Sequence, residues 1–385
     1  MEYKQREAFY LLKIIAAAID GGCVEIPTDN FDWDNLFQLT VMHKVEGLAY
    51  AGLAQTSGLP DEVLNRFAEA YKLSVFTEYV QHSEGVKLLR LMEKNGIDCL
   101  PLKGWVIKPL YPQPALRSMC DIDILIKKPQ SAAVKNLMVS MGYTVESFGS
   151  NPDVYIKKPI MNIEIHNALI RDKTDHFATA WDRAVLKDGR SHTYLMTDED
   201  YYIFLLAHLR KHFFGSGTGV RSVTDVWVYL KNYESTLDWA YIKEKLSDSG
   251  IWEFDRRIYA LCLCWFAGAE KTPEVEEYEE KILFSAAYGA GETAAKNAVV
   301  SDINSTVGVK NTFFKKTIYL LRLMFPGVSV MSASYPFVKS CSLLLPAAWV
   351  LRGFKSLFFR KEAVKSTFSN VLEINNDELN GMNDK

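Results

Sequence analysis

The sequence lacks any hydrophobic segment long enough to cross a membrane. The apolar run Cys341–Leu351 contains Pro346 and is far shorter than the ~20 residues that a spanning helix needs. Near the start of the chain, Lys13 interrupts the apolar residues between positions 8 and 19, so this segment is typical of a globular helix and not of a signal peptide. We therefore expect a cytoplasmic protein with no transmembrane segment.

The sequence also lacks a metal-binding or disulfide pattern of cysteines. None of its cysteines has the spacing of zinc ligands, and their number is too small for a disulfide scaffold in a chain of 385 residues. Buried free thiols in a reducing compartment fit this pattern best. The six cysteines are Cys23, Cys99, Cys120, Cys262, Cys264 and Cys341.

The chain lacks a large excess of either sign of charge, with 44 lysines and arginines against 47 aspartates and glutamates. The net charge of −3 predicts no overall affinity for polyanions. Residues 310–365 are the exception, because ten lysines and arginines there face a single acid, Glu362. This basic segment is either a surface that contacts a polyanion or an acidic membrane, or a pair of helices whose lysines cover an apolar stripe.

The chain is long enough for two or three domains, and the pattern of its apolar residues changes along its length. Apolar residues at helical spacing predict an N-terminal helical region over residues 1–92. Residues 93–170 form short strand-like runs with one or two helices, and residues 171–300 are helical again. The basic helices 301–365 and a disordered tail, 366–385, complete the chain. The predicted fold class is α+β, with a small mixed sheet flanked by helical regions.

Within residues 93–170, short β-branched runs alternate with turn residues. Pro129 fits the first turn of a helix that ends near Met141, and Gly142 fits its C-terminal cap. A second, short helix follows the turn at Lys103 and Gly104. The predicted strands are 98–102, 116–126, 144–148, 154–157 and 161–165, and the predicted helices are 105–111 and 129–141.

Two aspartates in the predicted strand 116–126 are the main candidates for chemistry. Asp121 and Asp123 are two residues apart, so on a strand their side chains point to one face, about 7 Å apart along the backbone. The isoleucines between and after them take the opposite face and can be buried. Two carboxylates at one spot are typical ligands for Mg²⁺ that holds substrate phosphates, although a chance polar pair on an edge strand remains the alternative.

Two other aspartate pairs in the chain have a different context. Asp32 and Asp34 precede a run with helical periodicity, and so do Asp198 and Asp200. Carboxylates at such positions accept hydrogen bonds from the free N–H groups of a helix start. We predict that these four acids are N-cap and first-turn residues of helices.

Three further elements extend the aspartate pair into a possible site. Lys103-Gly104 forms a strand-to-helix turn where a glycine allows close approach of a phosphate and the lysine adds charge, although a plain turn fits equally well. Arg117 can hold a phosphate or form a structural salt bridge. Glu164 and His166 share one face of another strand, so Glu164 can supply a third carboxylate and act as general base, whereas the histidine fits a structural role better.

A predicted helix in the 171–300 region contributes a separate group of polar residues. His208 and His212 lie on one helix face, but no His-Glu-x-x-His motif or third zinc ligand accompanies them. Lys211, Arg221 and Asp225 line either a nucleotide or acceptor pocket, or an ordinary solvated face. We predict that this face forms a wall of the substrate site.

Together these motifs carry a family resemblance. They are Leu102-Lys103-Gly104, Leu110-Tyr111-Pro112, Leu116-Arg117, Asp121–Ile126, Gly142-Tyr143, Glu164-Ile165-His166, the polar residues from His208 to Asp225, and Phe325-Pro326, Tyr335-Pro336 and Leu345-Pro346. In this combination the chain resembles the uncharacterised nucleotidyltransferases of the polymerase-beta superfamily. It departs from the superfamily at the turn, where Gly-Ser or Gly-Gly is usual and Lys103-Gly104 stands here.

The resemblance implies a Mg²⁺-dependent nucleotidyltransferase that moves a nucleoside monophosphate from an NTP to an acceptor. It implies that Asp121, Asp123 and Glu164 hold two Mg²⁺ ions and that Lys103-Gly104 lies near the triphosphate. The acceptor can be a small molecule, a protein or an RNA end. The alternatives are a non-catalytic nucleotide-binding module of the same fold and a phosphotransferase. Predicted nucleotide-binding residues are Lys103, Gly104, Arg117, Lys211 and Arg221.

Overall fold

A computed structural model describes residues 2–27, 31–170, 175–215, 217–285 and 342–359, together with positions 317, 321, 324–327 and 331. It divides the chain into two units, one of residues 1–213 and 218–287 and the other of residues 214–217 and 288–385. The domain boundaries at 92, 170, 300 and 365 stay predictions. Most of the basic segment 310–365 and the whole tail 366–385 lie outside the described residues.

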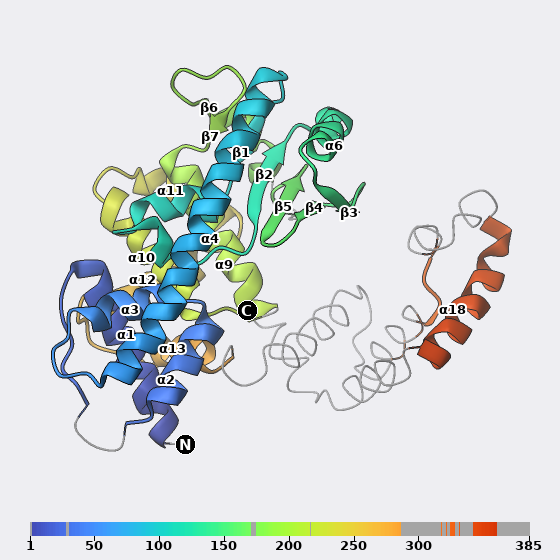
Figure 1. The fold of residues 1–385 in the computed structure, drawn as a ribbon. Coiled ribbons are helices and arrows are strands. Elements are labelled where there is room, and N and C mark those ends of the chain that lie inside the picture. Colours follow the sequence, from blue (N-terminus) through green and yellow to red (C-terminus); the bar gives the residue numbers. More distant parts are fainter. Residues whose placement is uncertain are drawn as a thin grey trace. The chain divides into compact units, whose positions relative to one another are not determined.

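The N-terminal region is helical, as its apolar periodicity predicts. Its helices are α1 (Glu2–Asp20), α2 (Trp33–His43), α3 (Glu46–Ala54) and α4 (Asp61–Lys94). The Asp32 carboxylate caps α2 by accepting a 2.8 Å hydrogen bond from the Asn35 amide, as predicted. Helix α4 is the long element that runs from the small N-terminal helices to the sheet (Figure 1).

The central sheet is mixed and has five strands. They are β1 (Cys99–Pro101), β2 (Ile122–Ile126), β3 (Thr144–Ser147), β4 (Asp153–Lys157) and β5 (Met161–His166). Their order is β1-β2-β5-β4-β3, and β2 and β5 are parallel while the other pairs are antiparallel. A mixed sheet with flanking helices confirms the α+β prediction.

The predicted strand 116–126 is too long by six residues at its start. Residues Pro114–Leu116 form a 3-10 turn (η2), and β2 begins only at Ile122, where pairing with β5 begins. The intervening chain turns Arg117 away from the sheet to meet Asp225. Asp121 therefore lies just before β2 and not within it.

The helices between these strands are short. Helix α5 (Gly104–Ile107) gives way to the 3-10 turn η1 (Lys108–Leu110), because Pro109 has no N–H to continue the α-helical ladder. The predicted helix 129–141 consists of η3 (Lys128–Gln130) and α6 (Ser131–Ser140), and Gly142 beyond it has a φ of +82°. A positive φ at this position is typical of a helix C-terminal cap.

Most of the described chain after residue 175 is helical. Its helices in the first unit are α7 (Asp175–Ala178), α8 (Ala180–Arg183), α9 (Asp198–Phe214), α10 (Val220–Tyr233), α11 (Trp239–Asp248), α12 (Trp252–Phe266) and α13 (Pro273–Ser285). Asp198 and Asp200 lie in the first turn of α9, as predicted. A small hairpin of β6 (Val185–Leu186) and β7 (Tyr194–Leu195) was not expected in this region.

In the second unit the described elements are η4 (Ser342–Leu344) and α18 (Leu345–Phe359). No helix in the described ranges is both long enough and apolar enough to span a bilayer.

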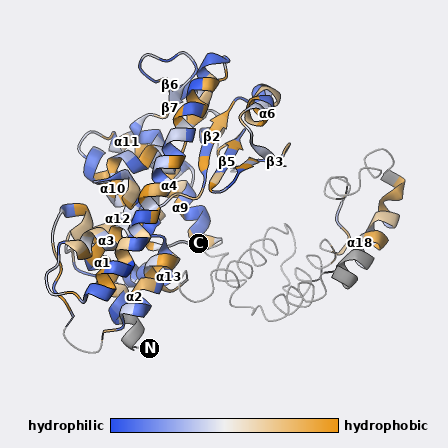
Figure 2. Cartoon of the chain, viewed as in Figure 1, coloured by the Kyte–Doolittle hydropathy of each residue, from blue (hydrophilic) through white to orange (hydrophobic). Residues whose placement is uncertain are grey.

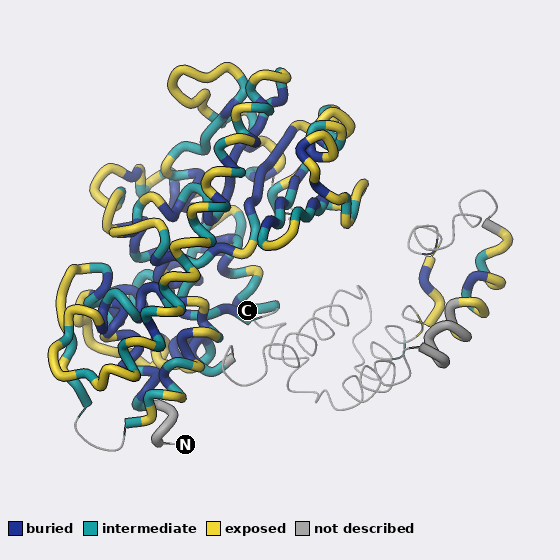
Figure 3. Tube along the Cα trace, in the orientation of Figure 1, coloured by how far each residue is buried: buried dark blue, intermediate teal, exposed yellow. Residues whose placement is uncertain are grey.

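The main hydrophobic core of the sheet lies between β2, β5 and helix α4. Ile122, Ile124 and Ile126 pack with Leu88 and Met92 of α4, and all five side chains are at most 1% exposed. Strand β2 is buried along its whole length (Figure 3), whereas the surrounding helices carry both hydrophilic and hydrophobic residues (Figure 2). The apolar side of β2 thus fixes its polar side chain, Asp123, in one orientation.

The cysteines fit the expectation only in part. No disulfide joins the five cysteines that the structure describes, and Cys99 and Cys262 are buried. Cys23 and Cys120, however, are exposed, so the prediction of uniformly buried thiols was wrong. Both lie in irregular segments between elements, where no strand or helix face determines burial.

Candidate functional site

Strands β2 and β5 bring Asp123, Glu164 and His166 together. The two strands are parallel neighbours, and Asp123 is aligned directly with Glu164 across them. Two residues further along β5, His166 projects from the same face as Glu164. One ligand atom from each of the three side chains lies within 4.8 Å of those of the other two. These groups form the centre of the candidate site.

Asp123 is the most enclosed of these residues, with 2% of its side chain exposed. Its Oδ1 accepts a 2.6 Å hydrogen bond from Lys103 Nζ and lies 2.7 Å from His166 Nε2. Burial alone would raise the pKa of Asp123, but the hydrogen bond to His166 and the charge of Lys103 outweigh it and lower the pKa below its ordinary value. Asp123 is therefore ionised at neutral pH.

The other two acids have the opposite shift. Burial raises the pKa of Asp121, and the negative charge of Asp123 raises it further. Burial likewise raises the pKa of Glu164, with added repulsion from Asp121 and Asp123. The structure thus brings all three predicted carboxylates into one electrostatic group, in which each negative charge disfavours the next. A cation placed among them relieves that repulsion.

The turn between β1 and α5 has a strained backbone. Lys103 has a φ of +45°, in a region that glycine adopts easily and lysine rarely does. The Tyr201 hydroxyl supports this turn by donating a 2.9 Å hydrogen bond to the Lys103 carbonyl. The conformation aims the ammonium group of Lys103 at Asp123.

Gly104 is needed for a reason that differs from the predicted one. A Cβ at this position would lie 2.4 Å from Arg117 Nη1 and 2.5 Å from Met119 Sδ. These side chains, which belong to the protein itself, leave no room for a larger residue. Whether a phosphate also approaches Gly104 stays a prediction.

Arg117 has a partner in the structure, and that partner is Asp225 of α10. Arg117 Nη2 donates to Asp225 Oδ2 at 2.8 Å and Nε donates to Oδ1 at 3.2 Å. The Tyr111 hydroxyl donates to the same Oδ1 at 2.7 Å. This arrangement matches the structural salt bridge that was the alternative reading of Arg117, and a phosphate-binding role for it stays a prediction.

Helices α9 and α10 form the opposite wall, where His208 and His212 face each other with their Nε2 atoms 3.2 Å apart. Burial, and then the positive charge of Lys103, holds the pKa of His208 well below its ordinary value, so His208 is neutral at pH 7. Arg221 Nη1 donates to the Ser118 carbonyl at 3.1 Å. This wall therefore presents neutral imidazoles beside a cation.

A single cavity of about 440 Å³ unites these groups. Its lining includes every residue that the sequence singled out for the site: Lys103, Gly104, Arg117, Asp121, Asp123, Glu164, Lys211 and Arg221, with the three histidines His166, His208 and His212. A volume of this size suits a small organic ligand. The cavity combines a carboxylate centre with cationic walls, a combination that suits a metal ion and a polyphosphate.

His166 lies in the cluster with Asp123 and Glu164, and its position two residues after Glu164 on one strand was the signal for this placement. The 2.7 Å contact of its Nε2 with Asp123 Oδ1 fits the structural role predicted for it, and a role as metal ligand stays open. Sequence reasoning missed Tyr201. Tyr201 acts through the Lys103 carbonyl, a contact between residues 98 positions apart that no local pattern indicates.

Comparison with known proteins identifies a family. A family described as "Uncharacterised nucleotidyltransferase" matches residues 29–267, which is more than half of the chain and includes the whole cavity lining. No curated protein and no solved structure matches the chain.

Proposed function

The chain belongs to this uncharacterised nucleotidyltransferase family, and from that premise we propose that it transfers a nucleoside monophosphate from an NTP to an acceptor with the help of Mg²⁺. The observation that carries the proposal is the alignment of Asp123 with Glu164 on parallel strands, in a cavity that Lys103, Lys211 and Arg221 also line. Phosphoryl-transfer sites combine these two features, because a polyphosphate needs both metal ligands and positive side chains.

The chemistry of the donor set fits a divalent cation. Asp121, Asp123 and Glu164 offer hard carboxylate oxygens, the ligands that Mg²⁺ prefers, and their mutual repulsion favours a positive ion among them. We assign all three as ligands for two ions. Mg²⁺ bound there supplies positive charge to the substrate phosphates and to the departing pyrophosphate.

The side chains around the acids would position the substrates. Lys103, Lys211 and Arg221 supply the positive charges that face a triphosphate in this cavity. An acceptor oxygen attacks the α-phosphorus in line, the bond from that phosphorus to the bridging oxygen of the β-phosphate breaks, and pyrophosphate leaves. Glu164 takes the proton from the acceptor hydroxyl. The fold contributes chiefly by holding these groups in place.

A label on the NTP tests the proposal directly. With Mg²⁺ and an α-labelled NTP, the label should move to an acceptor while pyrophosphate is released, and Asp123→Asn and Glu164→Gln should each abolish the transfer. The matched control is Asp34→Asn, which changes an acid of another Asp-x-Asp pair, exposed on α2. A metabolite extract, a protein fraction and tRNA serve as separate acceptor pools.

Three outcomes would replace the proposal with another function. Transfer of a γ-label together with release of a nucleoside diphosphate would identify a phosphotransferase. A protein whose melting temperature Mg²⁺–NTP raises but which transfers no label would be a non-catalytic nucleotide-binding module, because ligands that bind the native state raise its stability. A folded protein that no Mg²⁺–NTP mixture stabilises would be an interaction module.

A further inference from the structure

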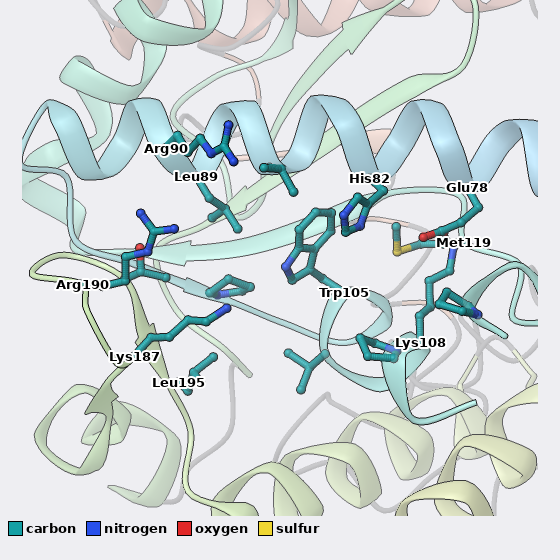
Figure 4. A pocket seen from close by; sticks show the side chains of 16 residues that line it. Glu78, His82, Leu89, Arg90, Trp105, Lys108, Met119, Lys187, Arg190 and Leu195 are labelled. Atoms are coloured by element: carbon teal, nitrogen blue, oxygen red, sulfur yellow. Dashed lines mark ion pairs between the residues drawn. The ribbon is translucent and has the colours of Figure 1, made fainter. Parts of the chain in front are cut away.

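A second cavity, of about 480 Å³, lies behind the turn that carries Lys103. It is bounded by one face of helix α4, by α5 and η1, and by the β6–β7 hairpin (Figure 4). Neither the family match nor the proposed reaction assigns it a role. Its size suits a small organic molecule.

The same short turn has two faces that serve two different cavities. Lys103, Gly104 and Ile107 line the candidate catalytic cavity, whereas Trp105, Val106 and Lys108 line the second one. The two cavities share no lining residue. A molecule in the second cavity is therefore held by side chains other than those that surround the carboxylates.

Positive charge dominates one end of the second cavity. Arg90 of α4 and Lys187 and Arg190 of the hairpin loop lie there (Figure 4), and in the described ranges none of these side chains has a hydrogen bond or ion pair. The cavity lining contains one acid, Glu78, and it is already paired with Lys108 at the other end. Three exposed cations around a concavity without a free acid favour an anionic ligand.

The floor between the two ends is aromatic and apolar. Trp105 lies at its centre, stacked on His82 with ring centroids 5.6 Å apart and an interplanar angle of 11° (Figure 4). Helix α4 makes room for the indole at Gly85, where a Cβ would lie only 2.2 Å from the Trp105 ring. Leu89 and Leu195 extend the apolar surface. A flat ring is the ligand group that fits such a floor.

We propose that this second cavity binds an anionic molecule that carries a flat aromatic or heteroaromatic ring, with the ring against the Trp105 floor and the phosphate or carboxylate on Arg90, Lys187 and Arg190. Nucleoside monophosphates and aryl phosphates both belong to this class. The proposal concerns binding alone and does not depend on the proposed transferase activity.

The test measures binding to the full chain by calorimetry, in EDTA so that no divalent cation contributes. The probes are 1-naphthyl phosphate, AMP, uncharged 1-naphthol and inorganic phosphate. The variant Arg90→Ala/Arg190→Ala removes two cavity cations, and Lys87→Ala/Lys94→Ala removes two exposed cations of α4 that lie outside the lining. Lys211→Ala reports on the catalytic cavity.

We expect 1-naphthyl phosphate or AMP, or both, to bind the wild type and the Lys87/Lys94 variant with equal affinity. Binding to the Arg90/Arg190 variant should be weaker by about tenfold or more, because each lost cation removes a charge-assisted contact. Naphthol and inorganic phosphate should bind far more weakly than the joined molecule. The relative affinities of AMP and 1-naphthyl phosphate show whether the cavity prefers a nucleotide or another aromatic anion.

The proposal is overturned if neither ring-bearing phosphate binds saturably, or if inorganic phosphate binds as tightly as they do. It also fails if the Lys87/Lys94 variant loses as much affinity as the Arg90/Arg190 variant. Weakening by Lys211→Ala alone would place the probe in the catalytic cavity instead.

Discussion

Arg117 and Asp225, 108 residues apart, form a forked ion pair with contacts of 2.8 and 3.2 Å. Both side chains are buried, at 9% and 5% exposure. The pair joins the segment before β2 to helix α10, and thus the carboxylate strand to the helical wall of the same cavity. Its integrity should therefore matter for stability and for the shape of the site.

Asp225→Ala should destabilise the fold by about 3–5 kcal/mol, because the loss of one partner leaves the other charge buried without compensation. Urea unfolding measures this change as a shift of the transition midpoint. Glu69→Ala is the matched control, since it removes an ion pair to Lys72 whose two side chains are 72% and 69% exposed, and it should change the midpoint little. Similar midpoints for both variants would contradict the prediction.

Gly104→Ala should destabilise the protein by about 1–3 kcal/mol, the usual cost of overpacking. The new Cβ would meet Arg117 Nη1 at 2.4 Å, and the fork on Asp225 prevents that guanidinium from moving aside. Thermal unfolding compares this variant with Gly22→Ala, whose Cβ would have its nearest neighbour at 3.8 Å. An unchanged melting temperature in Gly104→Ala would mean that the turn adapts.

Asp255, which lines neither cavity, provides a pH-dependent test of stability. Burial raises its pKa from 3.8 to about 6, although Tyr202 donates a 2.7 Å hydrogen bond to it. Between about pH 4 and 6 the folded state thus binds a proton that the unfolded state has released, so this group's contribution to stability falls as the pH rises through that window.

Asp255→Asn should therefore be more stable than the wild type by about 3 kcal/mol at pH 7, and the difference should vanish near pH 4. An asparagine oxygen can still accept the bond from Tyr202. Unfolding free energies of both proteins at several pH values provide the measurement. A difference that does not vary with pH would show that ionisation of Asp255 costs little.

The residues that sequence alone could locate are those governed by local patterns. The alternation around Asp123 and around Glu164 predicted two strands with buried backs, and the structure has both. Asp32 caps α2 and Asp198 lies in the first turn of α9, because acids at a helix start interact only with nearby N–H groups. The family resemblance, which rested on such local motifs, is confirmed as well.

Other features depend on long-range contacts and had no local signal. The sequence could not predict that Arg117 pairs with Asp225 or that the Tyr201 hydroxyl binds the Lys103 carbonyl, because each contact depends on how the helices pack on the sheet. The early start predicted for β2 was wrong for the same reason, since β2 begins at Ile122, where its pairing with Ile163 of β5 begins. The roles of the cavity residues stay predictions that activity measurements can test.

Substitutions of His166 test whether this residue binds a metal ion or holds the carboxylates in position. Its Nε2 lies 2.7 Å from Asp123 Oδ1 and 3.7 Å from Glu164 Oε2, so it can hold the carboxylates in position or join them as a ligand. In either role His166→Ala should weaken Mn²⁺ binding, used as a spectroscopic substitute for Mg²⁺, by about 10- to 100-fold.

His166→Gln decides between the two roles. Its side-chain amide can still donate a hydrogen bond to Asp123, so it should restore most of the affinity if the histidine only orients the carboxylate, and little if the imidazole itself binds the ion. The control is His192→Ala, which removes a histidine paired with Asp98 outside both cavities. Mn²⁺ affinity that is equal in the wild type and in His166→Ala would mean that the ion binds without this residue.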